Sequence, residues 1–244
     1  MFQALRTDFQ IIFDRDPAAR NWLEVLLCYP GLHAIWLYRL AHLLHNWHLP
    51  LIPRLISQFA RLFTGVEIHP GAVIGSGAFI DHGMGVVIGE TAIIGQNVVL
   101  YQGVTLGGTG KEVGKRHPTL GDNVVVGAGA KVLGNIEIGS GSRIGAGSVL
   151  LKTVPPGSTV VGIPGRVVQR KSEISPLDHN RLPDPEGDVI RALVQRVEYL
   201  EQEIKERRVL ADMIEDPVLN AVRPKHLKTL RGEHQDGFSG GAGI

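Results

Sequence analysis

The chain carries a large aliphatic residue every six positions between Ile68 and Leu150, and this period restricts its fold more than any other feature. The thirteen positions are Ile68, Ile74, Ile80, Ile88, Ile94, Leu100, Leu106, Leu120, Val126, Val132, Ile138, Ile144 and Leu150. A period of six matches neither the 3.6 residues of a helical turn nor the two-residue alternation of a strand. It fits a chain that turns a corner every six residues, so that three short faces make one coil of a β-helix.

Small residues near the corners support this interpretation. Glycine follows the inward aliphatic residue at Gly75, Gly95, Gly127, Gly139 and Gly145, where a Cβ would crowd the turn. Three positions per coil give about four coils, and a strand spacing of ~4.8 Å then predicts a prism about 20 Å tall. A sandwich of short strands, the main alternative, would show turn signals every ~8–12 residues and no fixed six-residue register.

The composition excludes several classes of protein. With 244 residues, 43% of them hydrophobic, and a formal net charge of +1, the chain shows no bias toward nucleic acid. Its only cysteine, Cys28, permits neither an intrachain disulfide nor a cysteine metal cluster, which favours a reducing compartment. The N-terminus lacks a basic segment followed by an apolar one, and Arg39 interrupts the most apolar stretch, residues 32–49. We therefore expect a cytoplasmic protein without a membrane span.

The pattern divides the chain into five segments. We expect an α-helical N-terminal domain (1–64), the β-helix (65–168), a polar linker (169–186), a further helix (187–212) and a flexible tail (213–244). The fold class is therefore mainly β, with helical additions at both ends.

Both helical segments carry apolar residues at helical spacing. In the N-terminal domain we expect these residues to face a core, among them Ile35, Leu40, Leu55 and Phe59. In the second helical segment, spacings of three and four alternate as in a coiled-coil seam, at Ile190, Leu193, Val197, Leu200 and Ile204. Two heptads are marginal alone, but a trimeric β-helix would hold three copies together and favour a trimeric coiled coil.

Two segments interrupt the six-residue repeat, and we expect the functional residues in these two segments. The first is the corner at Asp81-His82, which is followed by a slip of two residues. The second is the stretch 107–118, eight residues beyond the repeat, which must leave the prism as a loop. Its glycines and basic residues suit an anionic ligand approached by backbone amides. It is not a phosphate-binding P-loop, because Thr105 occupies the first glycine position of that motif and Glu112 follows its lysine.

At these positions the chain closely resembles the serine acetyltransferases. The matching motifs are Glu67-Ile68-His69-Pro70, Asp81-His82-Gly83, Gly89-Glu90-Thr91-Ala92, Leu106-Gly107-Gly108-Thr109-Gly110-Lys111, Arg116-His117-Pro118 and Gly127-Ala128-Gly129-Ala130-Lys131. They occur in unbroken order between Arg15-Asp16-Pro17 and Pro164. The resemblance implies a left-handed parallel β-helix that forms homotrimers. It also implies acetyl transfer from acetyl-CoA to the hydroxyl of L-serine, which gives O-acetyl-L-serine and CoA in the first step of cysteine biosynthesis.

The resemblance also implies roles for individual residues. His82 corresponds to the general base, and histidine suits that role because it titrates near neutral pH. Glu67 corresponds to the carboxylate that orients the imidazole. Many relatives carry aspartate at this position. Because the side chain of glutamate is longer, it must bend to place its oxygen at the same point.

Substrate and co-substrate contacts follow in the same way. Asp16 and Asp81 match positions that bind the ammonium group of serine. Arg116 and His117 match positions that bind its carboxylate. A guanidinium group suits a carboxylate because it can donate two parallel hydrogen bonds to it. Acetyl-CoA is expected between neighbouring subunits, and no metal is expected. The residues expected to contact acetyl-CoA are Gly107, Gly108, Thr109, Lys111 and Ala128.

Other interpretations remain open at this stage. From spacing alone, Asp16 before Pro17 is a good helix N-cap, and Glu67 or Arg116 could be ordinary surface charges. The chain could also be another hexapeptide-repeat acetyltransferase. A third possibility is a zinc hydratase resembling the γ-type carbonic anhydrases, with His69, His82 and His117 as ligands, although the closely spaced histidine pair of that family is missing.

The last expectations concern partners. Serine acetyltransferases commonly end in isoleucine on a mobile tail that binds cysteine synthase, and Gly243-Ile244 fits that pattern. An interaction scaffold acting mainly through this tail is a further alternative. L-cysteine is an expected feedback inhibitor at the serine site. Pairing of two trimers into a hexamer is less expected, because only about 64 residues precede the β-helix.

Overall fold

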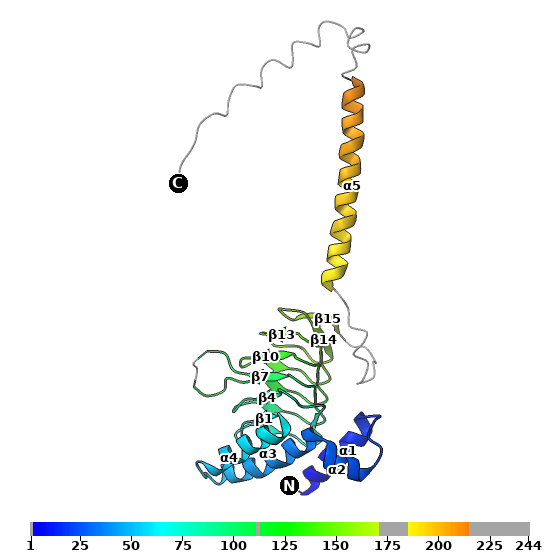
Figure 1. Ribbon diagram of the computed structural model, residues 1–244. Coiled ribbons are helices and arrows are strands. Elements are labelled where there is room, and N and C mark those ends of the chain that lie inside the picture. The colour runs from blue at the N-terminus through cyan, green and yellow to red at the C-terminus, as the bar shows by residue number, and fades with distance from the viewer. Residues whose placement is uncertain (1, 111–112, 171–184, 215–244) are drawn as a thin grey trace. The chain divides into compact units, whose positions relative to one another are not determined.

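The computed structural model of this chain describes residues 2–110, 113–170 and 185–214 (Figure 1). It divides into two compact units, residues 1–184 and 185–244. We describe each unit by itself.

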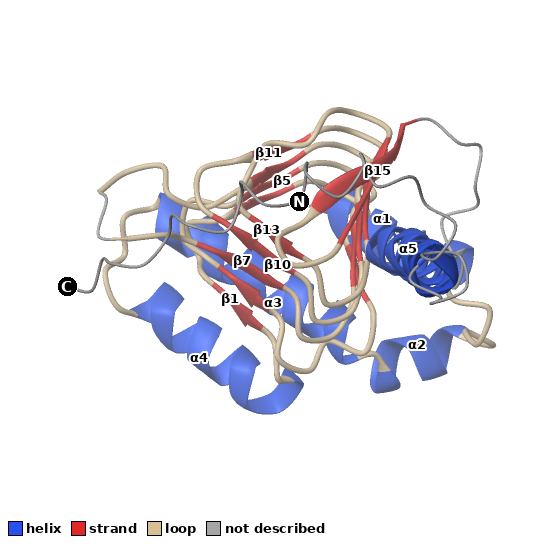
Figure 2. Ribbon diagram, turned by 90° about the horizontal axis from the view of Figure 1, so that it is seen from above, coloured by secondary structure: helices blue, strands red, loops and turns tan. Residues whose placement is uncertain are grey.

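The first unit is built on a parallel β-helix, as the six-residue period predicts, and it has the left hand that the family resemblance implies. Within the described residues, its strands form three sheets around a triangular cross-section (Figure 2). Sheet A contains β1 (Glu67–Ile68), β4 (Val87–Ile88), β7 (Thr105–Gly107), β10 (Lys131–Leu133) and β13 (Val149–Leu150). Sheet B contains β2 (Val73–Ile74), β5 (Ile93–Ile94), β8 (Thr119–Leu120) and β11 (Glu137–Ile138). Sheet C contains β3 (Phe79–Ile80), β6 (Val99–Leu100), β9 (Val125–Val126), β12 (Arg143–Ile144), β14 (Ser158–Val161) and β15 (Arg166–Arg170).

The strand register confirms both interruptions of the repeat. In sheet A, Val87 pairs with Thr105, eighteen positions later, which is one undisturbed coil of three six-residue faces. Glu67 pairs with Val87 after twenty positions, so the first coil holds two extra residues. Thr105 pairs with Lys131 after twenty-six positions, so the third coil holds eight extra residues. Figure 1 shows the resulting loop leaving the stack after β7.

The thirteen periodic aliphatic residues fill the shaft of the prism. Each is at most 7% exposed, and full burial of such a side chain contributes about 1.5–3 kcal/mol. The corners stack closely enough to require glycine at some positions. A Cβ on Gly75 would lie 2.6 Å from the carbonyl oxygen of Gly95 in the next coil, a separation that no real Cβ tolerates.

Helices cover one face and the base of the prism. They are α1 (Phe2–Arg15), α2 (Trp22–Cys28), α3 (Pro30–Asn46) and α4 (Ile52–Thr64). Ile12, Val25 and Leu32 from the first three helices pack with the outward residues Phe79 and Val99 of sheet C. That face of the prism is therefore covered by the N-terminal helices.

At the base, α3 runs beneath the first coil. Ala34, Ile35 and Tyr38 join the core of the shaft, and the Tyr38 hydroxyl donates to the carbonyl oxygen of Ala72 at 2.6 Å. Asp8 and Arg39 form a buried ion pair that also binds the backbone of this coil, where Asp8 accepts from the N–H of Gly77 at 2.9 Å. These contacts join α1 and α3 to the prism.

The expectation of buried large residues is wrong for much of the N-terminal domain. Ile35 is buried, but Leu55 and Phe59 of α4 are 56% and 54% exposed. Their helix turns its small residues inward instead, and the hydroxyl of Ser57 donates to the carbonyl oxygen of Ile68 at 2.6 Å. Such a short approach leaves no room for large side chains, so they point outward. Leu40 of α3 is also exposed.

The first unit ends with an antiparallel pair, β14 and β15. The second unit contains α5 (Pro185–Ile214), the C-terminal helix that the fold class predicts. Among the described residues, no helix combines the length and the apolar character needed to cross a bilayer. The predicted linker (169–186) and tail (213–244) lie almost entirely outside the described residues.

Candidate active site

The first interruption of the repeat forms the corner between β3 and β4. We call residues Asp81–Gly85 the His82 corner. His82 has a left-handed backbone with a φ of 58°, which is uncommon for a residue with a side chain. Two turn bonds hold it, from the N–H of Gly83 to the Asp81 carbonyl at 2.7 Å and from the N–H of Met84 to the His82 carbonyl at 3.0 Å. The imidazole is 72% exposed and therefore accessible to a ligand.

A close backbone contact with α3 positions the His82 corner. A Cβ on Gly31 would lie 2.0 Å from the carbonyl oxygen of Ile80, the residue before the corner. Only glycine allows the first turn of α3 to come so near the end of β3. The start of α3 therefore fixes where the chain leaves the sheet toward His82.

Asp16 brings a second carboxylate to this part of the molecule. Its Oδ1 accepts the N–H of Ala18 at 2.8 Å, and its Oδ2 accepts the hydroxyl of Tyr29 at 2.6 Å. Asp16 follows the last residue of α1, so the alternative that it caps the start of a helix is wrong. It closes a turn, and its carboxylate is held in a fixed orientation.

The pKa values of two tyrosines, Tyr29 and Tyr101, are raised by burial and by the negative charges of Asp16 and Asp81. Burial, the hydrogen bond to Asp16 and the charges of Asp16, Glu24 and Asp81 all raise the pKa of Tyr29. Burial, and then the charge of Asp81, raise the pKa of Tyr101. The charges of both carboxylates therefore act on the same hydroxyl groups, and Asp81 lies beside His82. Such negative charge suits a cationic group such as an ammonium.

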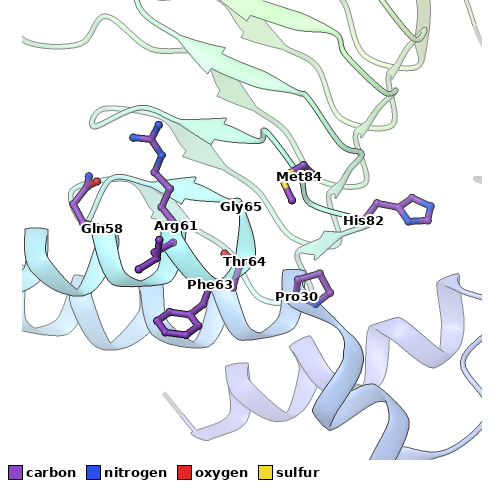
Figure 3. A pocket seen from close by; sticks show the side chains of 9 residues that line it. Pro30, Gln58, Arg61, Phe63, Thr64, Gly65, His82 and Met84 are labelled. Carbon is purple, nitrogen blue, oxygen red and sulfur yellow. The ribbon is translucent and has the colours of Figure 1, made fainter.

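His82 also lies at the rim of an open pocket of about 680 Å³. The pocket is lined by Arg61 and Phe63 from the end of α4 and by His82 and Met84 from the corner. Figure 3 shows that the imidazole of His82 points away from Arg61 and Phe63. Glu67, the predicted partner of His82, lies on β1 and forms an ion pair with Arg61 at 3.0 Å. The carboxylate oxygen that does approach His82 belongs to Asp81, at 3.9 Å from Nε2. The pairing of Glu67 with His82 stays a prediction.

The second interruption ends in a dense set of hydrogen bonds. We call Glu90, Thr91, Lys115, Arg116 and His117 the Arg116 corner. The Thr91 hydroxyl accepts the backbone N–H groups of Arg116 at 3.0 Å and of His117 at 3.1 Å. The ammonium of Lys115 donates to the carbonyl oxygens of Thr91, at 2.9 Å, and of His117. The end of the loop is therefore fastened to the coil below it.

The geometry of this corner determines the tautomer of His117. The backbone N–H of Thr91 donates to Nδ1 of His117 at 3.1 Å. Because a backbone amide can only donate, Nδ1 must be unprotonated, and the neutral ring carries its proton on Nε2. Burial and the neighbouring Arg116 also lower the pKa of His117, which favours the neutral ring. His117 is thus prepared to donate one hydrogen bond through Nε2.

Gly89 makes room for this ring. A Cβ at position 89 would lie 2.0 Å from Cδ2 and 2.1 Å from Nε2 of His117. No side-chain rotation of the other neighbours would relieve that overlap, because the clash is with the ring itself. Gly89 is therefore a condition for the observed position of His117.

Arg116 is already paired with a carboxylate. Its Nη2 lies 2.5 Å from Oε2 of Glu90, and this hydrogen bond is the main reason that the pKa of Glu90 is lowered. A ligand carboxylate that binds Arg116 must therefore compete with Glu90. Arg116 and Glu90 are both partly exposed, at 30% and 41% of their side chains, so a ligand can reach them.

His69 lies on the same edge of the prism, one coil below Glu90. Its Nδ1 accepts the N–H of Gly71 at 3.0 Å, and burial lowers its pKa to about 4, assisted by the charge of Arg54. His69 and His117 thus share an edge, whereas His82 belongs to the other corner. In the part of the chain that the structure describes, no group of three or more His, Cys, Asp or Glu side chains is arranged to hold a metal ion.

Sheet A separates the two corners. In the second coil the chain leaves the His82 corner at Gly85, crosses sheet A as β4 and reaches the other edge at Gly89. Four residues of extended chain span about 13 Å, whereas a single amino acid spans at most ~3.6 Å along the backbone. The backbones of the two corners of one chain are therefore about 13 Å apart across sheet A.

The residues predicted to contact acetyl-CoA divide between the same two edges. Gly107 is the last residue of β7. A Cβ on Gly108 would lie 3.2 Å from the carbonyl oxygen of Arg116. Both glycines therefore lie on the edge of the prism that carries the Arg116 corner. Thr109 lies near Gly134, which follows β10 on the same edge. Ala128 follows β9 and lies two coils from the His82 corner on its edge. Lys111 lies outside the described residues.

Four positioning residues were not predicted as part of the site. Tyr29 and Gly31 follow α2, and their role depends on contacts with residues far away in the sequence. Gly89 and Thr91 belong to a motif that the sequence does single out, but no spacing rule connects them with residues 116 and 117 across the extra loop. The loop adds eight residues to its coil, so position 118 should stack over position 92. This is the only sequence signal that could have connected Gly89 and Thr91 with residues 116 and 117.

Comparisons with known proteins complete the description of the site. Residues 117–152 match the family model "Bacterial transferase hexapeptide (six repeats)". A serine acetyltransferase of Synechococcus elongatus is 65% identical over 206 residues, which are 84% of each chain. The crystal structure of Neisseria gonorrhoeae serine acetyltransferase in complex with serine is 43% identical, with a TM-score of 0.67 over 69% of each chain. A serine acetyltransferase in complex with cysteine is 45% identical, with a TM-score of 0.67 over 68% of this chain and 69% of that chain.

Proposed function

Since the chain belongs to the serine acetyltransferase family and is an acyltransferase, we propose that it transfers the acetyl group of acetyl-CoA to the hydroxyl of L-serine. The products are O-acetyl-L-serine and CoA, in the first step of cysteine biosynthesis. The observation that carries this proposal is the pair of corners, because one offers carboxylates and an exposed imidazole and the other an anion site.

The chemical step is assigned to His82. Its imidazole accepts the proton of the serine hydroxyl while the oxygen attacks the thioester carbonyl of acetyl-CoA. The new C–O bond replaces the C–S bond, and the imidazolium then returns the proton to the leaving thiolate. Glu67 would orient the ring and stabilise its charged form. To do so it must exchange its present ion pair with Arg61 for His82.

Recognition of serine is assigned to both corners. Asp16 and Asp81 attract the ammonium group beside His82, where two carboxylates already raise the pKa of Tyr29. Arg116 binds the substrate carboxylate after release from Glu90, and His117 donates its Nε2 proton to the same carboxylate. Together these contacts select an amino acid over a sugar or another alcohol.

We assign the complete site to two neighbouring subunits of a homotrimer. Sheet A keeps the backbones of the two corners of one chain about 13 Å apart, and we infer that an amino acid contacts both corners where two copies come together. Acetyl-CoA would lie in the same junction, along Gly107, Gly108 and Thr109 of one subunit and Ala128 of the next. Lys111 is assigned to this site by the family resemblance alone.

Regulation and partners are proposed from the relatives. One related structure holds serine and another holds cysteine, and we propose L-cysteine as a feedback inhibitor at the serine site. Binding of the C-terminal Ile244 to cysteine synthase also remains a proposal, because Ile244 lies outside the described residues. A cytoplasmic location and a dimer of trimers are further expectations from the sequence.

Thiol release from acetyl-CoA tests the reaction. The purified chain should release CoA with L-serine and much less with L-homoserine or a galactoside. Equal or greater release with either of the other acceptors would overturn the assignment of substrate, and no release with any of them would overturn the reaction.

Mixed assemblies test the shared site. His82→Asn and Arg116→Ala are each expected to be inactive, but their co-expression should restore a fraction of the activity. The restored site takes His82 from one variant and Arg116 from the other. Absence of any recovery in co-purified mixed trimers would contradict a site built from two subunits.

A further inference from the structure

The C-terminal helix α5 exposes an apolar stripe that has no partner within the described residues. The stripe consists of Ile190, Leu193, Val197, Leu200 and Ile204, which are between 40% and 59% exposed. Their side chains recur at positions a and d of successive heptads. A helix of 30 residues with this stripe in water gains little from tertiary packing. We therefore expect the stripe to be buried against another apolar surface of the same length.

The charged residues beside the stripe fit a second copy of the same helix. With Ile190 at position a, Arg196 and Glu203 fall at position g, and Glu201 and Arg208 fall at position e. In a parallel, in-register coiled coil, each g residue faces the e residue five positions later on the neighbouring chain. Arg196 then meets Glu201, and Glu203 meets Arg208, so both contacts join opposite charges.

The same residues fit three strands better than two. Ile and Val at position a with Leu at position d alone would favour two strands. However, Val189 and Val194 at positions g and e widen the apolar stripe in the first heptad, which is the pattern of a bundle. The long stem of Arg196 can also cover the edge of a wider seam while its guanidinium reaches the glutamate. In the proposed trimer, three tethered helices would also meet at high effective concentration.

We propose that three copies of α5 associate through this stripe as a parallel, in-register coiled coil. The seam runs from Ile190 to Ile204 and ends at the next d position, which is Arg207 and forms an ion pair with Glu203 of its own helix at 2.8 Å. The occupant of the apolar stripe is therefore the same helix of the other subunits.

Disulfide cross-linking of the full-length chain tests this arrangement. Cys28, the only cysteine, is first replaced in a Cys28→Ser background. Ile190→Cys and Ile204→Cys are then oxidised separately and analysed on non-reducing gels. In a parallel, in-register coil each cysteine meets its own copy, and up to about two thirds of the chains become covalent pairs, because the third cysteine of each trimer has no partner.

The control places the cysteine on the opposite side of the helix, at position f, as Gln202→Cys. This variant should remain unlinked. Cross-linking at only one of positions 190 and 204 would contradict a parallel arrangement, and levels equal to the control at both would overturn the proposal. Serine-dependent thiol release by the same variants should be unchanged, so a failure here is distinguishable from a failure of the proposed function.

A charge exchange tests the register. Arg196→Glu places like charges opposite Glu201 and should reduce cross-linking at position 190 several-fold. Adding Glu201→Arg restores opposite charges and should restore cross-linking. Failure of the double variant to recover, with cross-linking of the parent intact, would contradict the proposed contact between positions 196 and 201.

Discussion

The two corners of the prism differ in how firmly they are held. At the Arg116 corner, Thr91 and Lys115 fasten the loop end, and Glu90 and Gly89 position Arg116 and the His117 ring. At the His82 corner, the imidazole is 72% exposed and is held mainly through its own backbone. The proposed anion site is thus positioned within one chain, whereas the side chain of the proposed base is largely exposed. This difference supports the proposal that the site is shared between two subunits.

Removal of His82 should have the largest effect. His82→Asn should lower kcat/KM for L-serine by about 10²–10⁴-fold, because no general base would remain. Asparagine tolerates the left-handed backbone, so the corner should keep its shape. Steady-state thiol release measures the loss, and light scattering checks that the assembly persists.

The matched control is His48→Asn. His48 is also exposed and also has a positive φ, of 60°, but it lies outside both corners. It should leave activity unchanged. If His82→Asn retained activity close to that of this control, the assignment of the base to the exposed corner would be wrong.

Gly89→Ala tests the crowded corner and should come next in size. The added Cβ must displace the His117 ring, from which it would lie 2.0 Å away. Loss of one hydrogen bond to a charged carboxylate predicts a KM for serine about 10–100-fold higher. The control is Gly71→Ala on the same edge, where the added Cβ would lie 3.2 Å from Nδ1 of His69 and 3.3 Å from Glu90, so that a small shift relieves the contact and the His117 ring is not touched. Equal effects of the two substitutions would show that the position of His117 does not matter.

Thr91→Val sharpens the same point with a smaller change. It removes the hydroxyl that accepts the N–H groups of Arg116 and His117. Unsatisfied amides cost about 1–3 kcal/mol, so the unfolding midpoint should fall and the KM for serine should rise by about tenfold. Thr91→Ser should restore both, since it keeps the oxygen. A serine variant as impaired as the valine variant would refute the role of the hydroxyl.

Glu90→Gln should have an opposite and modest effect. The ion pair with Arg116 is partly exposed, and such pairs contribute about 0.2–1 kcal/mol. Its loss should therefore lower the KM for serine by about two- to fivefold while the KM for acetyl-CoA stays constant. A higher KM for serine would mean that Glu90 supports substrate binding rather than competing with it.

The sequence predicts the scaffold of both corners more fully than their contacts. A six-residue period depends on local sterics and on burial along the shaft, so it fixes coils, register and the two interruptions. The bonds of Thr91 to Arg116 and His117 depend on how a loop folds back across a coil, which no local pattern encodes.

The N-terminal helices show the same limit. Helical spacing correctly indicates Ile35 as buried, but it cannot distinguish α4, whose close approach to β1 requires Ser57 and Ala60 inside and Phe59 outside. Likewise, the proposed pairing of Glu67 depends on whether Arg61 or His82 is nearer, which spacing does not decide.

The smallest expected effect concerns pH and again separates the corners. The pKa of His69, on the edge of the Arg116 corner, is lowered to about 4 by burial and by Arg54. The folded chain therefore binds fewer protons than the unfolded chain between a pH of about 6.5 and about 4. The free energy of unfolding should fall as the pH drops through that interval, and His117, whose pKa is lowered as well, acts in the same direction.

Because His69 is only half-buried, solvent screening reduces its contribution to about 1 kcal/mol between pH 7 and pH 4. Urea unfolding at a fixed protein concentration should show this loss in the parent chain and a flatter profile in His69→Gln. His48→Gln, at an exposed position, should keep the slope of the parent. A parent-like slope in His69→Gln would assign the pH sensitivity elsewhere and weaken the contrast between a tightly packed anion site and an open corner at His82.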